Sequence, residues 1–140
     1  MDTAAFFDGI NGLITAIPSG IKVGALTNAC VAYARAVLAT NGVTERFCSI
    51  HGADSVPKPK PFADGLFLVC KEMGLEPSEC VYIGDSPSDG EAAYAAGMGA
   101  VGVIWGSHSL EKVAEAPFDV VCSSLTELDS VLSRAYCKNN

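Results

Sequence analysis

Three features that would direct a chain to a membrane or to nucleic acid are missing from this sequence. No apolar run approaches the roughly 18–20 residues needed to cross a bilayer, so we expect no membrane partner. The first residues, MDTAAFF, carry an acid and no basic stretch, which argues against a secretory signal. Lysine and arginine together number 9 against 16 acids, and the resulting net charge of −7 argues against nucleic acid as a partner.

Closely spaced cysteine pairs are also missing, although the chain contains six cysteines. None of them forms a CxxC motif, and most stand in apolar stretches such as FCSI, LVCKEM and VVCSS. A free cysteine packs as a small hydrophobe, whereas extracellular disulfide frameworks belong to smaller, loop-rich chains. We therefore expect reduced core thiols rather than disulfides or a zinc site, and a cytoplasmic, reducing location.

The remaining composition favours one folded domain spanning residues 1–140, because 49 % of the residues are hydrophobic and only 18 % are charged. Short β-branched runs predict strands at 21–26, 47–52, 80–85, 100–105 and 119–124. Helices are predicted at roughly 9–17, 29–41, 61–73, 87–96, 108–115 and 125–136, with Asn28 as an N-cap and with Gly42, Gly74 and Gly97 as terminators. This alternation predicts an α/β fold, a three-layer Rossmann-like parallel sheet with helices on both faces.

In such a sheet, ligands bind beyond the carboxyl ends of the strands. The first predicted strand ends in Thr27-Asn28, where a hydroxyl, an amide and a helix N-terminus would suit an anion. The same two residues could instead only cap the helix. In Val56-Pro57-Lys58-Pro59-Lys60-Pro61, prolines hold the backbone extended, so Lys58 could present a fixed ammonium group to a phosphate. The alternative there is a solvated Lys-Pro loop.

The most specific pattern is Gly84-Asp85-Ser86-Pro87-Ser88-Asp89, which follows an apolar strand directly. Two carboxylates at a strand end suit a hard cation, because Mg²⁺ prefers oxygen ligands and keeps several waters. Helix capping would explain Asp89 alone, but it does not require Asp85. This segment therefore predicts a metal site at Asp85 and Asp89.

Together and in this order, the three segments resemble the haloacid dehalogenase superfamily, in particular its phosphoglycolate phosphatase-like members. The resemblance covers roughly residues 9–132. It implies that Thr27 and Lys58 are catalytic, that Thr27, Asn28 and Lys58 bind phosphate, and that Asp85 and Asp89 hold Mg²⁺. The family's Lys-Pro-x-Pro pattern selects Lys58 over Lys60. The implied substrate is a small phosphorylated metabolite, such as phosphoglycolate or a sugar phosphate, or a phosphate ion.

One part of the family pattern is absent. The family's nucleophile stands in an Asp-x-Asp motif at the end of the first strand, and no Asp-x-Asp occurs in this chain. The nearest candidate, Asp8, has Ile10 where the second aspartate belongs. The chain therefore resembles the C-terminal part of the core, truncated at its N-terminus, without the nucleophile strand and without the cap domain. Two acids alone are expected to bind Mg²⁺ weakly.

The missing strand would leave two unpaired strand edges in the centre of the sheet. The flanking strands could close up, the segment Thr3–Phe7 could fill the gap, or a second chain could supply a strand, which would make a dimer or a complex. We expect closure or a partner chain rather than Thr3–Phe7.

Two functions remain open from the sequence. The first is a Mg²⁺-dependent phosphatase, which requires either a longer protein or a partner chain to complete the site. The second is a catalytically silent phosphatase-like domain that binds phosphate, metal or a protein. A receiver-type signalling domain also combines acids and a lysine on a parallel sheet, but its acid pair lies at the first strand, which contradicts the order here.

Overall fold

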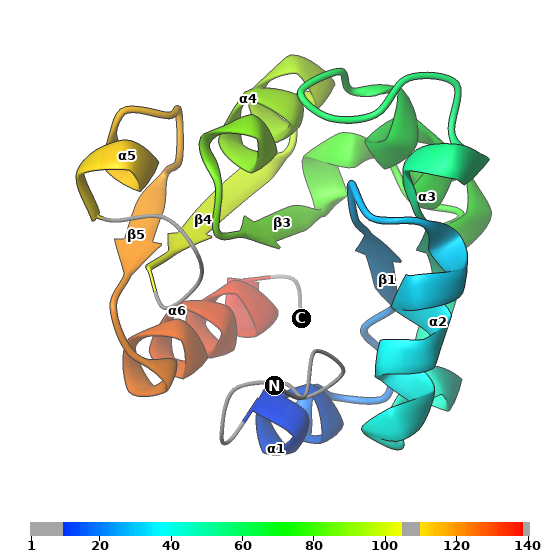
Figure 1. Cartoon of the computed structure of the whole chain (residues 1–140). Coiled ribbons are helices and arrows are strands. Elements are labelled where there is room, and N and C mark those ends of the chain that lie inside the picture. Colours follow the sequence, from blue (N-terminus) through cyan, green and yellow to red (C-terminus); the bar gives the residue numbers. More distant parts are fainter. Residues whose placement is uncertain (1–9, 105–109, 139–140) are drawn as a thin grey trace.

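The structure, a computed structural model, describes residues 10–104 and 110–138 (Figure 1). The strands are β1 (Val23–Leu26), β2 (Phe47–His51), β3 (Val81–Gly84), β4 (Gly99–Val103) and β5 (Val120–Cys122). The helices are α1 (Ile10–Ala16), α2 (Val31–Thr40), α3 (Asp64–Met73), α4 (Pro87–Ala96), α5 (Leu110–Ala114) and α6 (Leu125–Lys138). Short 3₁₀ turns are η1 (Thr44–Arg46), η2 (Ala53–Ser55) and η3 (Pro77–Glu79). The predicted elements agree with these bounds to within a few residues.

The predicted helix terminators are confirmed. Gly74 and Gly97 cap α3 and α4 with φ angles of 73° and 75°, and Gly42 follows α2 with a φ of 69°. These left-handed conformations place a Cβ too close to the following carbonyl, so glycine is the residue that adopts them readily. The predicted N-cap is wrong, because Cys30 and not Asn28 occupies that position of α2.

The strands form two parallel sheets where the sequence predicted one. β1 pairs with β2, and β3 pairs with β4, which in turn pairs with β5. Within residues 10–104 and 110–138, no strand pairing joins β1 to β3, so closure of the two flanking strands is wrong for the described chain. The alternative filler, Thr3–Phe7, lies outside the described residues. Among the described residues, the break between the two sheets lies where the family resemblance places the nucleophile strand.

Helices cover both faces of the sheets, as predicted. Beneath α3 and α4 lies a cluster built around Leu66, Cys70, Ala92, Ala93 and Ala100. On the other face of β4 and β5, α6 packs Leu128 and Leu132 against a second cluster of Val101, Val103 and Cys122. A third cluster, Leu38, Val43 and Ile50, lies beneath α2. Truncating such a buried leucine to alanine lowers the free energy of unfolding by about 2–5 kcal/mol. The clusters on both faces therefore contribute to the stability of the fold.

Two hydrophobic side chains of β3 are exposed. Side chains alternate across a strand, and Tyr82 turns toward the α3–α4 cluster while Val81 and Ile83 point to the opposite face. Val81 is 45 % exposed and Ile83 is 38 % exposed. A β-branched residue in a parallel strand is normally buried, so this strand lacks part of its usual cover.

The cysteine prediction holds only in part. Every cysteine whose side chain is described is a free thiol, and Cys70 and Cys122 are buried as expected. Cys30 and Cys48 are exposed instead, because Cys30 precedes α2 and Cys48 points outward from β2. No helix in the described ranges is both long and apolar enough to cross a membrane.

Candidate functional site

Four of the five predicted site residues, Thr27, Asn28, Asp85 and Asp89, lie where β1 and β3 end. β3 runs into Gly84 and Asp85, and α4 begins two residues later, with Ser86 at its N-cap and Asp89 in its first turn. One carboxylate oxygen of Asp89 accepts hydrogen bonds from the backbone N–H groups of Asp85 (3.0 Å) and Ser86 (3.1 Å) and from the Ser86 hydroxyl (3.1 Å). Asp89 therefore fixes the loop between strand and helix, as the capping interpretation predicted.

Gly84 makes this close approach of the carboxylate possible. A Cβ at position 84 would lie 2.3 Å from both the Cβ and Oδ2 atoms of Asp89, well inside van der Waals contact. Packing against Asp89 therefore requires glycine at position 84, independently of any chemistry at Asp85.

The second carboxylate oxygen of Asp89 pairs with Lys60. The Lys60 ammonium forms a salt bridge with Asp89 Oδ1 and donates a hydrogen bond to the Tyr82 hydroxyl at 2.8 Å. The side chains of Lys60 and Asp89 are only 7 % and 4 % exposed. A buried ion pair in this geometry is stable only as a pair, because either charge alone would be left without its partner in a poorly solvated place.

The structure places Lys60 at the strand ends, whereas the Lys-Pro-x-Pro pattern selected Lys58. Lys58 is exposed, and its ammonium lies 5.0 Å from the centroid of the Phe62 ring. The physical reason lies in Asn28. Its side chain accepts a hydrogen bond from the Lys60 N–H and donates one to the Lys60 carbonyl, both at 3.1 Å, so residue 60 is the one tied to the end of β1.

Tyr82 joins the two sheets at the same place, and sequence reasoning missed it. Its hydroxyl donates to the carbonyl of Leu26, the last residue of β1, at 2.9 Å, and lies 3.4 Å from Asp89 Oδ1. Burial, and then the negative charges of Asp89 and Asp85, raise the pKa of Tyr82 well above its usual value of 10. The phenol therefore keeps its proton and donates a hydrogen bond to the Leu26 carbonyl at the end of β1.

Asn28 contacts Lys60, and the polar groups of Thr27 and Asn28 are partly in use. The Thr27 hydroxyl oxygen accepts a hydrogen bond from the Ala29 N–H at 3.1 Å, and the Thr27 N–H donates to the His51 carbonyl. The Asn28 amide is committed to the Lys60 backbone. The N-terminus of α2 is also occupied, because the Val31 N–H donates to the Asp54 carboxylate at 2.8 Å. The predicted anion site therefore has fewer free hydrogen-bond donors than expected.

Asp85 is half-buried, and no hydrogen bond to its carboxylate is found among the described residues. It is the one member of the acid pair whose oxygens are free to bind a ligand. Both oxygens of Asp89 are already used, and no group of three or more His, Cys, Asp or Glu side chains in the described ranges is placed to hold a metal ion. The described donors of this chain therefore do not fit a complete Mg²⁺ site, which normally draws on more oxygen ligands.

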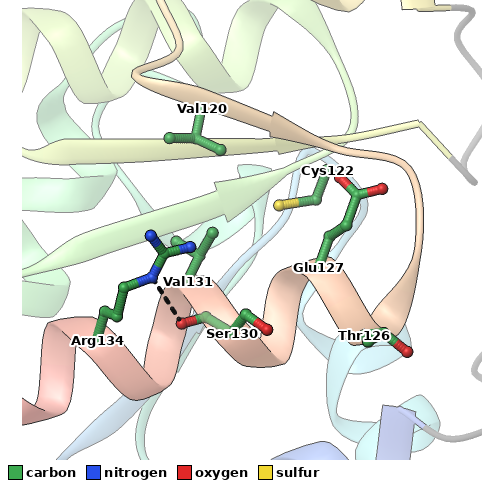
Figure 2. A pocket seen from close by; sticks show the side chains of 7 residues that line it. All are labelled: Val120, Cys122, Thr126, Glu127, Ser130, Val131 and Arg134. Atoms are coloured by element: carbon green, nitrogen blue, oxygen red, sulfur yellow. Dashed lines mark hydrogen bonds between the residues drawn. The ribbon is translucent and has the colours of Figure 1, made fainter.

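One cavity lies away from these residues, and another borders Thr27. One, of about 370 Å³, lies between β5 and α6, where Figure 2 shows Glu127 and Arg134 on the helix beside Val120 and Cys122. Its polar groups are engaged locally, since Glu127 accepts from the Ser123 hydroxyl at 2.7 Å and Arg134 donates to the Ser130 carbonyl at 3.4 Å. The other cavity, of about 170 Å³, lies between the end of β1 and α2 and has Thr27 on its wall.

A family model for haloacid dehalogenase-like hydrolases matches residues 2–103. The chain belongs to this haloacid dehalogenase-like hydrolase family. The resemblance drawn from the sequence motifs is thereby confirmed.

Two relatives that the chain resembles are phosphoglycolate phosphatases. The chain is 34 % identical over 129 residues to a phosphoglycolate phosphatase of Xylella fastidiosa, which covers 91 % of this chain and 55 % of the relative. It is 31 % identical over 120 residues to a phosphoglycolate phosphatase of Escherichia coli, covering 86 % of this chain and 48 % of the relative. The chain thus spans about half the length of these curated relatives.

A solved haloacid dehalogenase family hydrolase from Deinococcus radiodurans, described with bound phosphate and sodium, shares the fold with a TM-score of 0.80. Its sequence identity is 24 %, and the match covers 91 % of this chain and 59 % of that chain. The Rossmann-like α/β architecture expected from the sequence is confirmed by this likeness, although the sheet is divided here.

Proposed function

We propose that this chain supplies the phosphate-binding part of a phosphatase site that acts on a small phosphorylated metabolite. The observation that carries the proposal is the buried Lys60 ammonium at the ends of β1 and β3. An ammonium group has three donors, and Asp89 and Tyr82 use two of them, so one N–H remains for a phosphate oxygen. A fixed positive charge at this point would stabilise the charge that develops during phosphoryl transfer.

The other residues take separate roles in this proposal. Thr27 would donate its hydroxyl hydrogen to phosphate, because only its oxygen is engaged by Ala29. Asn28 acts as a positioning residue for Lys60 rather than as a phosphate ligand. Lys58, exposed beside Phe62, has no role in the site. Phosphoglycolate is the substrate class that the names of the relatives favour.

Asp85 is the residue we assign to cation binding. Because Asp89 is committed to Lys60 and to the first turn of α4, the chain alone would hold Mg²⁺ weakly, through one free carboxylate and water. Additional oxygen ligands would have to come from a segment outside the described residues or from another chain.

A strand between β1 and β3 would supply those ligands, and we propose that turnover requires it. Its support is that no strand of residues 10–104 and 110–138 pairs with the inner edge of either sheet, and that Val81 and Ile83 are exposed. Unpaired strand edges template the addition of a further strand. A preceding part of a longer protein, a second copy or a different protein could provide it.

The second candidate is a domain that binds phosphate without catalysis. The commitment of both Asp89 oxygens favours it, as does the absence of Asp-x-Asp from the sequence. Positioned charges can hold a phosphate, but they cannot form a phosphoenzyme without a nucleophile.

Phosphate titration tests the binding proposal. Inorganic phosphate would be added to the 140-residue protein, with and without Mg²⁺, and followed by ³¹P NMR line width and calorimetry. The test variant is Lys60→Met combined with Asp89→Asn, which removes both charges together, and Lys58→Met is its matched control. We expect the double variant to lose phosphate binding and the control to retain it. Equal binding by all three proteins would overturn the proposal.

Hydrolysis of p-nitrophenyl phosphate with Mg²⁺ separates the two candidate functions. Turnover that Asp85→Asn abolishes would support the phosphatase and exclude the silent domain. Phosphate binding without turnover above the Asp85→Asn background, when the segment that supplies the further strand is also present, would support the silent domain.

A further inference from the structure

Two cysteines from different parts of the fold bring their sulfur atoms together on the side of α3. Cys70 lies in the second half of α3, and Cys80 lies between η3 and β3. Their Sγ atoms are 3.8 Å apart. Cys70 is only 2 % exposed, and Cys80 is half-buried against the same core cluster. Neither cysteine takes part in the proposed phosphate site.

We propose that Cys70 and Cys80 are a site of reversible disulfide formation. A disulfide bond is about 2.05 Å long, so the two sulfur atoms must approach by roughly 1.8 Å. Rotation of the two side chains about their Cα–Cβ bonds covers a displacement of this size without a change in chain topology. The reaction is independent of the proposed phosphatase function.

The chemistry requires a two-electron oxidant, for which a low-molecular-weight disulfide such as oxidised glutathione is sufficient. One cysteine thiolate attacks a glutathione sulfur, which breaks that S–S bond and releases one glutathione thiolate. The second cysteine thiolate then attacks the mixed disulfide and releases the other glutathione. In sum, two cysteine thiols become one protein disulfide, and one oxidised glutathione becomes two reduced molecules.

The bridge would join the two halves of the fold. α3 packs on β1 and β2, whereas β3 belongs to the other sheet. α3 also follows the Lys60 loop directly, and β3 leads directly to Asp85. A disulfide would therefore fix the spacing between the elements that hold Lys60 and Asp89, at the end of those elements away from the site.

The thiols are protected from fast reaction. Burial, and then the neighbouring Cys70 sulfur, raise the pKa of Cys80 to about 12, and burial also raises the pKa of Cys70. Because the thiolate is the attacking species, oxidation should be slow at neutral pH and should accelerate about tenfold for each added pH unit. The pair would thus respond to sustained oxidation.

Mass spectrometry tests the bridge directly. Trypsin leaves Cys48 and Cys70 in one peptide and Cys80 in another, so the experiment uses a Cys30→Ser, Cys48→Ser background that removes the exposed thiols. The folded protein is incubated with oxidised glutathione at pH 8 to 9, alkylated and digested. We expect a cross-linked peptide pair that joins Cys70 to Cys80 and disappears after reduction. Cys70→Ala should abolish it, and Cys122→Ala, which removes another buried thiol, should leave it intact.

Thermal unfolding supplies a second readout. The disulfide would close a loop of about 11 residues, which restricts the unfolded chain and should raise the Tm on the order of 10 °C. The increase should reverse on addition of dithiothreitol and should be absent from Cys70→Ala. Failure to cross-link after sustained incubation at pH 9, under which Cys30 and Cys48 of the unmodified chain are fully glutathionylated, would overturn the proposal. Cross-linking that appears only in denaturing urea, or that lowers the Tm, would do the same.

Discussion

Removing the Lys60 ammonium should destabilise the fold far more than removing the neighbouring Lys58. In Lys60→Met, the side-chain volume is nearly kept, but the buried Asp89 carboxylate loses its counter-charge. Breaking a buried pair from one side costs about 3–5 kcal/mol. We expect the lower part of that range, because backbone N–H groups and Ser86 still bind the other Asp89 oxygen.

The same reasoning predicts a small loss of stability for the control variant, Lys58→Met. Lys58 is exposed, and its one described contact is the approach to the partly exposed Phe62 ring. An exposed cation–π contact contributes on the order of 0.5–1 kcal/mol, so Lys58→Met should cost no more than that.

Urea unfolding followed by far-UV circular dichroism measures both effects. With a slope of about 2 kcal/mol per molar urea, a loss of about 3 kcal/mol moves the midpoint down by roughly 1.5 M. The double variant Lys60→Met, Asp89→Asn should recover most of this loss, because it leaves no unpaired charge. A Lys60→Met midpoint within 0.3 M, roughly the measurement error, of the Lys58→Met midpoint would refute the buried-pair reasoning.

Three further variants test neighbouring contacts. Gly84→Ala should lower the free energy of unfolding by about 2 kcal/mol or more, because the added Cβ would meet the Asp89 side chain at 2.3 Å; urea unfolding measures the change. Asn28→Ala should cost about 1–2 kcal/mol and weaken phosphate binding in the calorimetric titration, because the Lys60 backbone loses both hydrogen bonds to the amide. Hydrogen bonds from Ser49 and then His51 lower the pKa of Glu72 from 4.5, so its contribution to stability is present above pH 4.5 and is lost as the pH falls through the lowered pKa. Glu72→Gln should therefore flatten the dependence of the urea midpoint on pH between about 5 and 3.

The elements of this fold could be predicted from sequence because their signals are local. β-branched runs marked the strands, and Gly74 and Gly97 marked helix ends where a left-handed residue is needed. The placement of Asp85 and Asp89 followed from their position directly after a strand. Each of these inferences depends on residues within one turn of each other.

The choice between Lys58 and Lys60 could not be made in that way. Both lysines stand in the same Lys-Pro repeat, so their local sequence is almost identical. What separates them is Asn28, which is 32 residues away and binds the Lys60 backbone. Tyr82 was missed for a related reason, since an aromatic residue in a strand is usually core, and its role depends on the hydrogen bond to the carbonyl of Leu26. The site is formed by contacts between segments that are far apart in the sequence, and a single sequence does not show such contacts.

The charges at the strand ends restrict how such a site can bind phosphate. Lys60 and Asp89 cancel as a buried pair, which leaves the half-buried Asp85 as the net charge of the described side chains there. A phosphate dianion that approaches through the one free N–H of Lys60 would therefore meet a second negative group nearby. In a partly desolvated site this repulsion is larger than it would be in water. Phosphate affinity should consequently be low for the chain alone and should increase when a divalent cation neutralises Asp85, so the two ligands are expected to bind cooperatively. This coupling makes the fixed Lys60 ammonium necessary but insufficient, which is the condition expected of one part of a larger phosphoryl-transfer site.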